Sequence, residues 1–125
     1  MARLALVVDD SMVIRHLLQR FLEESGFTVQ TVSNGAEALK ALETLRPAVI
    51  FTDLQMPRLD GYELIEIIKG NPELSSIPIV VLAANPLSEA PSAVPQTQFV
   101  VAKDLNIETQ LRQILEELRP LLASA

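Results

Sequence analysis

Short apolar runs recur along the chain and alternate with stretches of mixed polarity. Four of these runs are rich in Val, Ile and Leu with few polar residues, which is typical of strands buried on both faces of a sheet. A fifth run, over residues 27–32, alternates β-branched and polar residues and also predicts a strand. The predicted strands cover residues 4–9, 27–32, 48–53, 77–84 and 98–103.

The stretches between the strands carry apolar residues at helical spacing, which predicts amphipathic helices. The first helix carries its stripe from Ile14 to Leu22 and should stop near Gly26, because glycine commonly ends helices. The second starts at Asn34, three residues before Glu37, in a pattern that resembles a capping box. Two further helices are predicted over residues 61–69 and 107–118.

The segment over residues 85–97 breaks this alternation. A helix is expected between the fourth and fifth strands, but prolines stand at positions 86, 91 and 95. A proline inside a helix removes a hydrogen bond and costs roughly 3 kcal/mol. We therefore expect at most a turn or two there, so that the fourth helix is weak or missing.

Strands that alternate with helices specify an α/β fold, a doubly wound parallel sheet with helices on both faces. A length of 125 residues fits one domain over residues 1–125. In such sheets, ligand sites form beyond the carboxyl ends of the strands, near the point where the strand order reverses. The residues that follow the strands are therefore the first candidates for a functional role.

Composition and charge exclude several classes of protein. Apolar residues make up 49% of the chain and charged residues 21%, which is a globular balance. The absence of cysteine excludes disulfides, cysteine-based zinc sites and thiol nucleophiles. The first ten residues hold too few apolar residues for a signal peptide or a membrane span. A net charge of −6 disfavours direct nucleic-acid binding, so we expect a cytoplasmic protein that binds neither membrane nor nucleic acid directly.

Charged residues stand at the ends of three predicted strands. The first strand ends in Asp9-Asp10, the third in Asp53 and the fifth in Lys103, and a parallel sheet brings all of them to one edge. Three carboxylates at one edge repel one another unless a divalent cation lies among them, and such oxygen ligands suit Mg²⁺ or Mn²⁺. A carboxylate nucleophile, a metal and an ammonium are the parts that phosphoryl transfer requires, so Asp53 would become an acyl phosphate. Alternatively, the paired aspartates only cap the next helix, and the lysine is a solvated strand end.

With these residues, the chain resembles receiver domains of bacterial two-component response regulators over nearly its whole length. The resemblance rests on LVVDDS (6–11), SNGAEAL (33–39) and, most specifically, DLQMPRLDGYEL (53–64). It implies a five-stranded, flavodoxin-like sheet. It also implies that Asp53 accepts a phosphoryl group from a phosphohistidine of a sensor histidine kinase or phosphotransfer protein. The domain would then signal through contact with an unknown downstream protein.

The resemblance also implies a role for each residue around the acceptor. Asp10 and Asp53 would ligate Mg²⁺, the backbone carbonyl of Gln55 would be a third protein ligand, and Asp9 would act mostly through water. Lys103 would bind the phosphoryl group.

Residues close in sequence to the acceptor receive further roles. Residues 56–57 and Gly61 would shape the loop after Asp53, and Gly61 would begin the next helix. Gln55 and Asn85 would flank the phosphoryl group. We predict that changing either of these two residues alters the rate of dephosphorylation more than the rate of phosphorylation.

Three residues depart from the family pattern. Ala83 stands where the family has a Ser or Thr hydroxyl that swings to the phosphoryl group. Val100 replaces an aromatic residue, and Phe99, one place away, should point to the opposite face. Asp104 replaces a proline that usually follows the lysine across a cis bond. A cis bond before a residue other than proline costs about 3–4 kcal/mol, so we expect the Lys103–Asp104 bond to be trans.

These departures leave two interpretations open. In the first, Asp53 is phosphorylated but the signal is read differently, or the domain serves as a phosphate relay or sink. In the second, the chain is a drifted pseudo-receiver that binds proteins independently of phosphorylation. The presence of every metal and nucleophile residue favours the first.

Two other classes fit the sequence less well. A Mg²⁺-dependent phosphohydrolase usually has an acid–base carboxylate two residues after its nucleophile. Gln55 stands at that place here, and its amide cannot donate or take a proton at neutral pH. We therefore expect no enzyme activity beyond self-phosphorylation and slow autodephosphorylation. A flavodoxin-like cofactor binder would want a Ser/Thr/Gly-rich phosphate loop after the first strand, but DDSMV (9–13) carries two aspartates that would repel a phosphate.

The last predicted helix carries an apolar stripe that is longer than one core face needs. The stripe continues to residues 121 and 122, past Pro120. It either packs on the sheet or helps to form a homodimer through the face from the fourth strand to the last helix.

Overall fold

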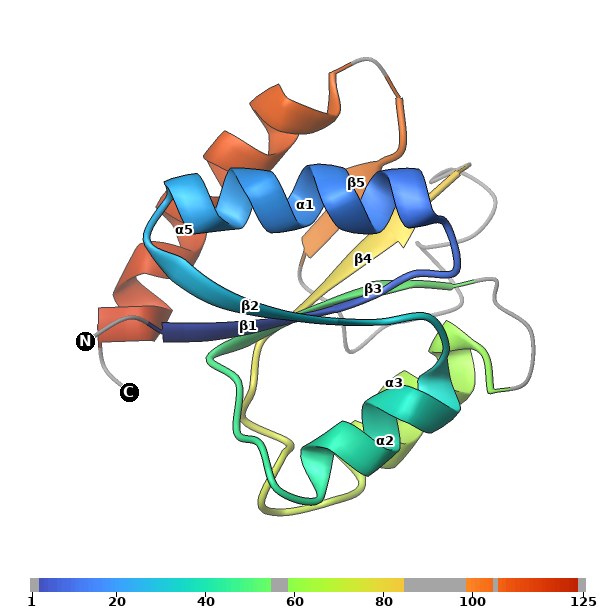
Figure 1. The fold of residues 1–125 in the computed structure, drawn as a ribbon. Helices are drawn as coiled ribbons and strands as arrows, with labels where there is room; N and C mark the ends of the chain where they lie inside the picture. Colours follow the sequence, from blue (N-terminus) through green and yellow to red (C-terminus); the bar gives the residue numbers. More distant parts are fainter. Residues whose placement is uncertain (1–2, 55–58, 85–98, 105, 124–125) are drawn as a thin grey trace.

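Five parallel strands form the centre of the structure, a computed structural model that describes residues 3–54, 59–84, 99–104 and 106–123 (Figure 1). The strand order is β2-β1-β3-β4-β5, and every neighbouring pair is parallel. The order reverses between β1 and β3, so the expected doubly wound sheet is confirmed. The strands are β1 Arg3–Val8, β2 Phe27–Val32, β3 Val49–Asp53, β4 Ile79–Ala83 and β5 Phe99–Ala102.

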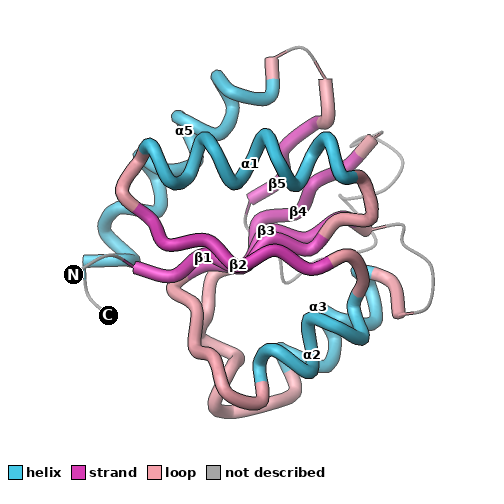
Figure 2. The backbone as a smooth tube through the Cα atoms, in the orientation of Figure 1, coloured by secondary structure: helices cyan, strands magenta, loops and turns pink. Residues whose placement is uncertain are grey.

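Helices cover both faces of this sheet (Figures 1 and 2). The helices α1 (Met12–Glu24) and α5 (Ile107–Ala123) pack on one face. The helices α2 (Gly35–Leu42) and α3 (Gly61–Lys69) pack on the other. The predicted weak fourth helix falls on residues 85–97, which lie outside the described part of the chain, so that prediction stays untested.

Successive residues of the central strands contribute to two separate apolar clusters. On β3, Ile50 packs with α2 and α3, whereas its neighbour Phe51 packs with α1 and α5, and both are fully buried. Side chains alternate across a strand, so a strand covered on both faces needs apolar residues at every position. This explains the continuous apolar runs in the sequence. The edge strand β2 is partly exposed and alternates instead.

The predicted start and stop signals hold in the structure. Asn34 Oδ1 accepts a hydrogen bond from Glu37 N at 2.9 Å at the start of α2, and Glu37 Oε1 accepts one from Ser33 N at 2.8 Å. Gly26 follows α1 with a φ of 99°, a left-handed conformation that suits glycine. These residues set where α2 begins and where α1 ends.

The last helix is longer than predicted, because it continues through Pro120 to Ala123. Its apolar stripe is used in the core. The buried residues of the stripe are Ile107, Leu111, Ile114, Leu118 and Leu122. Packing on the sheet therefore accounts for these five positions, and the homodimer stays a prediction.

Candidate functional site

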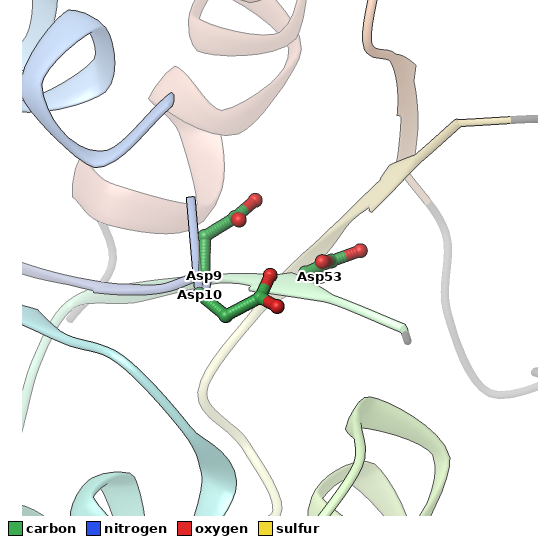
Figure 3. Close-up of side chains that lie close together, drawn as sticks. All are labelled: Asp9, Asp10 and Asp53. Atoms are coloured by element: carbon green, nitrogen blue, oxygen red, sulfur yellow. The ribbon is translucent and has the colours of Figure 1, made fainter. Parts of the chain in front are cut away.

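Three carboxylates meet at the carboxyl edge of the sheet, as the sequence predicts (Figure 3). Asp9 and Asp10 follow β1, and Asp53 is the last residue of β3. Each offers a carboxylate oxygen within 4.8 Å of those of the other two. Asp9 and Asp53 are buried, with 0% and 6% of their surface exposed, whereas Asp10 is exposed. The cluster therefore has an open side toward solvent at Asp10.

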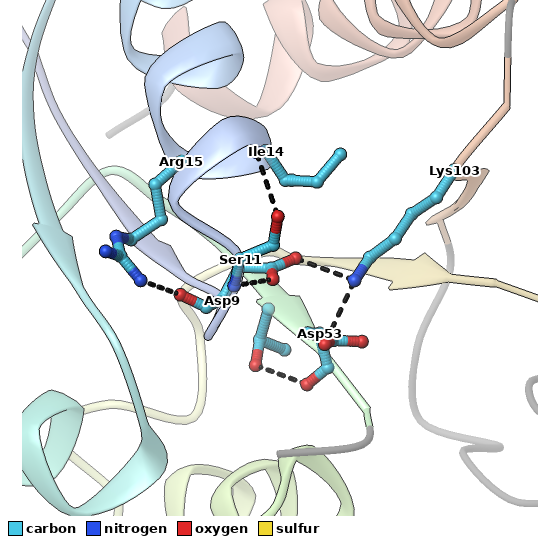
Figure 4. A network of polar contacts seen from close by, with 7 residues as sticks. Asp9, Ser11, Ile14, Arg15, Asp53 and Lys103 are labelled. Atoms are coloured by element: carbon cyan, nitrogen blue, oxygen red, sulfur yellow. Dashed lines mark hydrogen bonds and ion pairs between the residues drawn. The ribbon is translucent and has the colours of Figure 1, made fainter.

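Lys103 completes the cluster from β5, the strand at one end of the sheet (Figure 4). It follows β5, and its Nζ lies 2.8 Å from Asp9 Oδ2 and 3.0 Å from Asp53 Oδ2. Burial alone would lower the pKa of Lys103, but the hydrogen bonds and charges of Asp9 and Asp53 outweigh it and raise the pKa above its usual value. The lysine is thus a charged partner of the cluster, and the interpretation as a solvated strand end is wrong.

The loop that carries Asp9 and Asp10 is held by α1. Asp9 Oδ1 accepts a hydrogen bond from Ser11 N at 2.8 Å, and Arg15 donates one to the Asp9 carbonyl at 2.6 Å. Ser11 is the N-cap of α1, and its hydroxyl accepts from Ile14 N at 3.3 Å. Because a serine caps the helix, the alternative that the paired aspartates serve only as its cap is wrong.

Asp53 is held by the backbone around it. The hydroxyl of the buried Thr52 donates to the Asp53 carbonyl at 2.9 Å, and Gly61 N donates to the Leu54 carbonyl at 2.9 Å. A Cβ atom at Gly61 would lie only 2.0 Å from the Asp53 carbonyl oxygen, so only glycine fits there. Gly61 also begins α3, as the resemblance implies. Residues 55–58 of this loop lie outside the described part of the chain, and so does the proposed ligand Gln55.

The donors present fit a divalent cation. They are all carboxylate oxygens, the ligands that Mg²⁺ prefers. Three carboxylates and one ammonium leave a formal charge of −2, which a divalent cation would balance. Asp9 Oδ2 is buried, and the ammonium of Lys103 at 2.8 Å compensates its charge. The cluster can therefore bind a metal.

The three departures from the family pattern lie around the lysine. Ala83 is fully buried at the end of β4, and its carbonyl accepts from Lys103 N at 3.0 Å. Val100 packs in the cluster of α2 and α3, whereas Phe99 packs in that of α1 and α5, so the expected opposite facing is confirmed. The Lys103–Asp104 bond is trans, as expected, since no peptide bond between described residues is cis. Asn85 lies outside the described residues.

Sequence reasoning missed three residues that hold the site. Arg15 and Thr52 bond backbone carbonyls, and Gln110 of α5 bonds the backbone of Ala102, next to Lys103. None of them forms part of a motif that the sequence offers. The contacts of Arg15 and Gln110 depend on where α1 and α5 pack against the sheet.

Residues 5–116 match the family of response regulator receiver domains, and the chain belongs to that family. Among curated proteins, Protein PilG of Pseudomonas aeruginosa is 38% identical over 79 residues, which are 63% of this chain and 58% of PilG. The chain spans between 20% and 58% of the length of such curated relatives. The shared part is the receiver domain of two-component response regulators.

Solved structures agree with this assignment. The receiver domain of sensor histidine kinase PA1611 from Pseudomonas aeruginosa, with a magnesium ion coordinated in its active-site cleft, is 27% identical at a TM-score of 0.84. The match covers 94% of this chain and 97% of that one. Response regulator TrrA from Thermotoga maritima, in complex with Mg²⁺ and BeF, is 28% identical at a TM-score of 0.81, with 93% and 98% covered. The flavodoxin-like receiver fold is therefore confirmed.

Membership of this family favours a phosphorylated receiver domain over a drifted pseudo-receiver. The family implies phosphorylation on an aspartate, and the pseudo-receiver alternative is not favoured because the acidic cluster and its lysine are assembled. Among the described residues, no helix has the length and apolar character needed to cross a membrane.

Proposed function

We propose that Asp53 is the phosphoryl acceptor of this receiver domain. The observation that carries the proposal is the position of Asp53, at the end of a buried strand among two further carboxylates, with Lys103 Nζ 3.0 Å from Oδ2. The donor is a phosphohistidine on a sensor histidine kinase or phosphotransfer protein. We take residues 1–125 as a single receiver domain.

The transfer exchanges one bond to phosphorus for another. A carboxylate oxygen of Asp53 attacks phosphorus, the bond from phosphorus to the histidine nitrogen breaks, and the imidazole leaves with the electron pair. Lys103, which starts in contact with Asp9 and Asp53, then pairs with an oxygen of the transferred group. Burial of Asp53 limits access of water to the acyl phosphate.

Asp10 and Asp53 would hold Mg²⁺ directly, with the Gln55 carbonyl as a third protein ligand and Asp9 acting through water. Mn²⁺ would fit the same oxygen donors. When bound, the cation supplies positive charge that neutralises the phosphoryl oxygens. The exposed carboxylate of Asp10 suits a direct ligand, and the buried carboxylate of Asp9, already bonded to Ser11 N and paired with Lys103, suits a supporting role.

The domain is phosphorylated on its own Asp53 and does not catalyse repeated reactions on external substrates. Gln55 supplies no acid–base group, so the acyl phosphate is lost only slowly. That Gln55 and Asn85 tune dephosphorylation more than phosphorylation stays a prediction, because both lie outside the described residues.

Output is through protein contact, in the cytoplasm and without direct binding of nucleic acid. The residues that differ from the family pattern, Ala83, Val100 and Asp104, lie on β4, on β5 and just after β5. We propose that the downstream partner, or a second copy of the chain, reads this region in a way that needs neither the hydroxyl nor the aromatic side chain.

Intact mass after incubation with Mg²⁺ and acetyl phosphate tests the acceptor. We expect the wild-type chain to gain one phosphoryl group and Asp53→Asn to gain none. Asp60→Asn is the matched control, because Asp60 caps α3 outside the cluster and asparagine also caps helices. Equal incorporation by wild type and Asp53→Asn would place the acceptor elsewhere. No incorporation by the wild type, with no binding of Mg²⁺, would overturn the proposed function.

A further inference from the structure

A side chain of α5 pairs with the outer edge of β5 immediately before Lys103. Gln110 Oε1 accepts a hydrogen bond from Ala102 N at 2.9 Å, and Gln110 Nε2 donates one to Ala102 O at 3.0 Å. Within the sheet that the structure describes, β5 is the last strand, so no strand neighbours it on that side. The carboxamide of Gln110 therefore supplies the two bonds that a further strand would supply.

The same carboxamide reaches the turn that follows the lysine. Gln110 Nε2 lies 3.3 Å from Asp104 Oδ1, which also accepts from Asn106 N at 2.8 Å. Asp104 N in turn donates to Ala102 O at 3.0 Å. Gln110 thus connects the residue before the lysine, the residue after it and the first turns of α5.

Lys103 is held from the inner side as well. Its backbone N donates to the Ala83 carbonyl at 3.0 Å, so its main chain is fixed between β4 and the Gln110 side chain. Its Nζ then reaches the two carboxylates at 2.8 and 3.0 Å. A shift of the backbone by about 1 Å would move the ammonium off at least one of them, and such misplacements cost reactions up to about a hundredfold.

We propose that Gln110 and Asp104 form a clamp that positions Lys103 for the phosphoryl group. The clamp works with a trans Lys103–Asp104 bond, where the family pattern has a proline after the lysine. Gln110 is a positioning residue, since it acts only through the backbone of Ala102 and the side chain of Asp104. This inference rests on the proposed phosphoryl acceptance by Asp53.

The clamp needs a side chain that both donates and accepts. In Gln110→Glu the shape is retained, but a carboxylate oxygen replaces the donor and faces the Ala102 carbonyl and the Asp104 carboxylate. Gln113→Glu makes the same change at an exposed position of the same helix and is the matched control. Adding Asp104→Asn to Gln110→Glu removes the repulsion between the two carboxylates but leaves one carboxylate oxygen facing the Ala102 carbonyl, so it should restore the clamp only in part.

The test measures phosphoryl incorporation from acetyl phosphate by intact mass and Mg²⁺ affinity by calorimetry, on chains whose folding is checked by thermal melting. We expect Gln110→Glu to slow incorporation about tenfold. Mg²⁺ affinity should be retained or increased, because the carboxylates are untouched and the competing ammonium is released. Gln113→Glu should match wild type, and the double variant should recover part of the rate. A merely structural role would weaken metal binding and phosphorylation together.

NMR separates failure of the clamp from failure of the proposed function. A fixed Lys103 should show two distinct Hε signals in the wild type, and these should merge in Gln110→Glu, whether or not the protein accepts phosphate. Wild-type incorporation with no slowing in Gln110→Glu overturns the clamp and leaves Asp53 as the acceptor. Absence of wild-type incorporation overturns the proposed function, and Hε signals that stay distinct in Gln110→Glu overturn the clamp.

Discussion

The site consists of two groups of residues at the carboxyl ends of the strands, here named the carboxylate edge and the lysine edge, and the two groups are held in place in different ways. The carboxylate edge consists of Asp9, Asp10 and Asp53 at the ends of β1 and β3. It is held by groups within a few residues in sequence, such as Ser11 N, the Arg15 guanidinium and the Thr52 hydroxyl.

The lysine edge consists of Ala83, the last residue of β4, and of Lys103 and Asp104, which follow β5. It is held from α5, through Gln110, which bonds a residue eight positions earlier in the chain. Groups close in sequence thus hold the carboxylate edge, whereas the lysine edge is held by a side chain of the helix that packs beside it. Variants at the two edges should therefore fail in different ways.

Gly61→Ala should do the most damage at the carboxylate edge. An added Cβ would lie 2.0 Å from the Asp53 carbonyl oxygen and 2.7 Å from Leu54 Cα, and both are backbone atoms that cannot move away cheaply. We expect a loss of about 3 kcal/mol in the free energy of unfolding, measured by urea denaturation. In Gly70→Ala, the matched control, the nearest atom would be Glu66 O at 3.3 Å and the backbone is already right-handed, so the change should be small. Equal stabilities of the two variants would contradict this account of Gly61.

Removal of the lysine charge should give a pH-dependent loss of stability. Because the carboxylates of Asp9 and Asp53 raise the pKa of Lys103 despite its burial, the protonated lysine stabilises the folded state. This contribution is complete below pH 10.5, the usual value for lysine, and is lost as the pH rises through the higher pKa of the folded state. In metal-free buffer, the difference in unfolding free energy between wild type and Lys103→Met should therefore be constant from neutral pH to that value and shrink above it.

Lys40→Met, which removes an exposed lysine from α2, is the reference for this measurement. It should differ little from wild type throughout. A difference for Lys103→Met that grows with alkaline pH would reverse the sign and exclude stabilisation by the protonated lysine.

Arg15→Met should weaken the carboxylate edge by a smaller amount. Its guanidinium donates to the Asp9 carbonyl at 2.6 Å, and a hydrogen bond from a charged group contributes about 1.5–3 kcal/mol. We expect a loss in that range by denaturation and a severalfold weaker Mg²⁺ affinity, because the loop that carries Asp9 and Asp10 is loosened. Arg20→Met on the same helix breaks only an exposed pair with Glu24 at 3.6 Å and should be nearly neutral. If both variants bind Mg²⁺ equally well, Arg15 does not position the loop.

The sequence predicted the carboxylate edge well because its chemistry is local. An apolar run followed by an aspartate fixes both the strand and the sheet edge at which Asp9 and Asp53 meet, and the alternation rule correctly placed Phe99 opposite Val100. The fold class followed from the same periodicity.

The supports of the lysine edge could not be predicted in this way. Gln110 lies on a helix whose sequence spacing marks it only as a polar position beside a buried stripe. Its contact with Ala102 depends on how deeply α5 packs against β5, which no local pattern specifies. The same holds for Arg15, whose carbonyl partner is set by the way α1 returns over β1.

Ala83→Ser should give the smallest effect, and it addresses the lysine edge directly. Ala83 is fully buried beside the lysine, with its carbonyl on Lys103 N at 3.0 Å. A hydroxyl there has no partner until a phosphoryl group arrives, so we expect a loss of about 1 kcal/mol in stability and a gain of a few-fold in the rate of phosphoryl incorporation. Ala84→Ser places the same hydroxyl at the next, exposed residue and should change neither. A faster Ala83→Ser would mean that the lysine edge still accepts the family's chemistry and lacks only one donor. An unchanged rate, with the expected loss of stability, would mean that the clamped Lys103 already supplies the stabilisation that a hydroxyl would add.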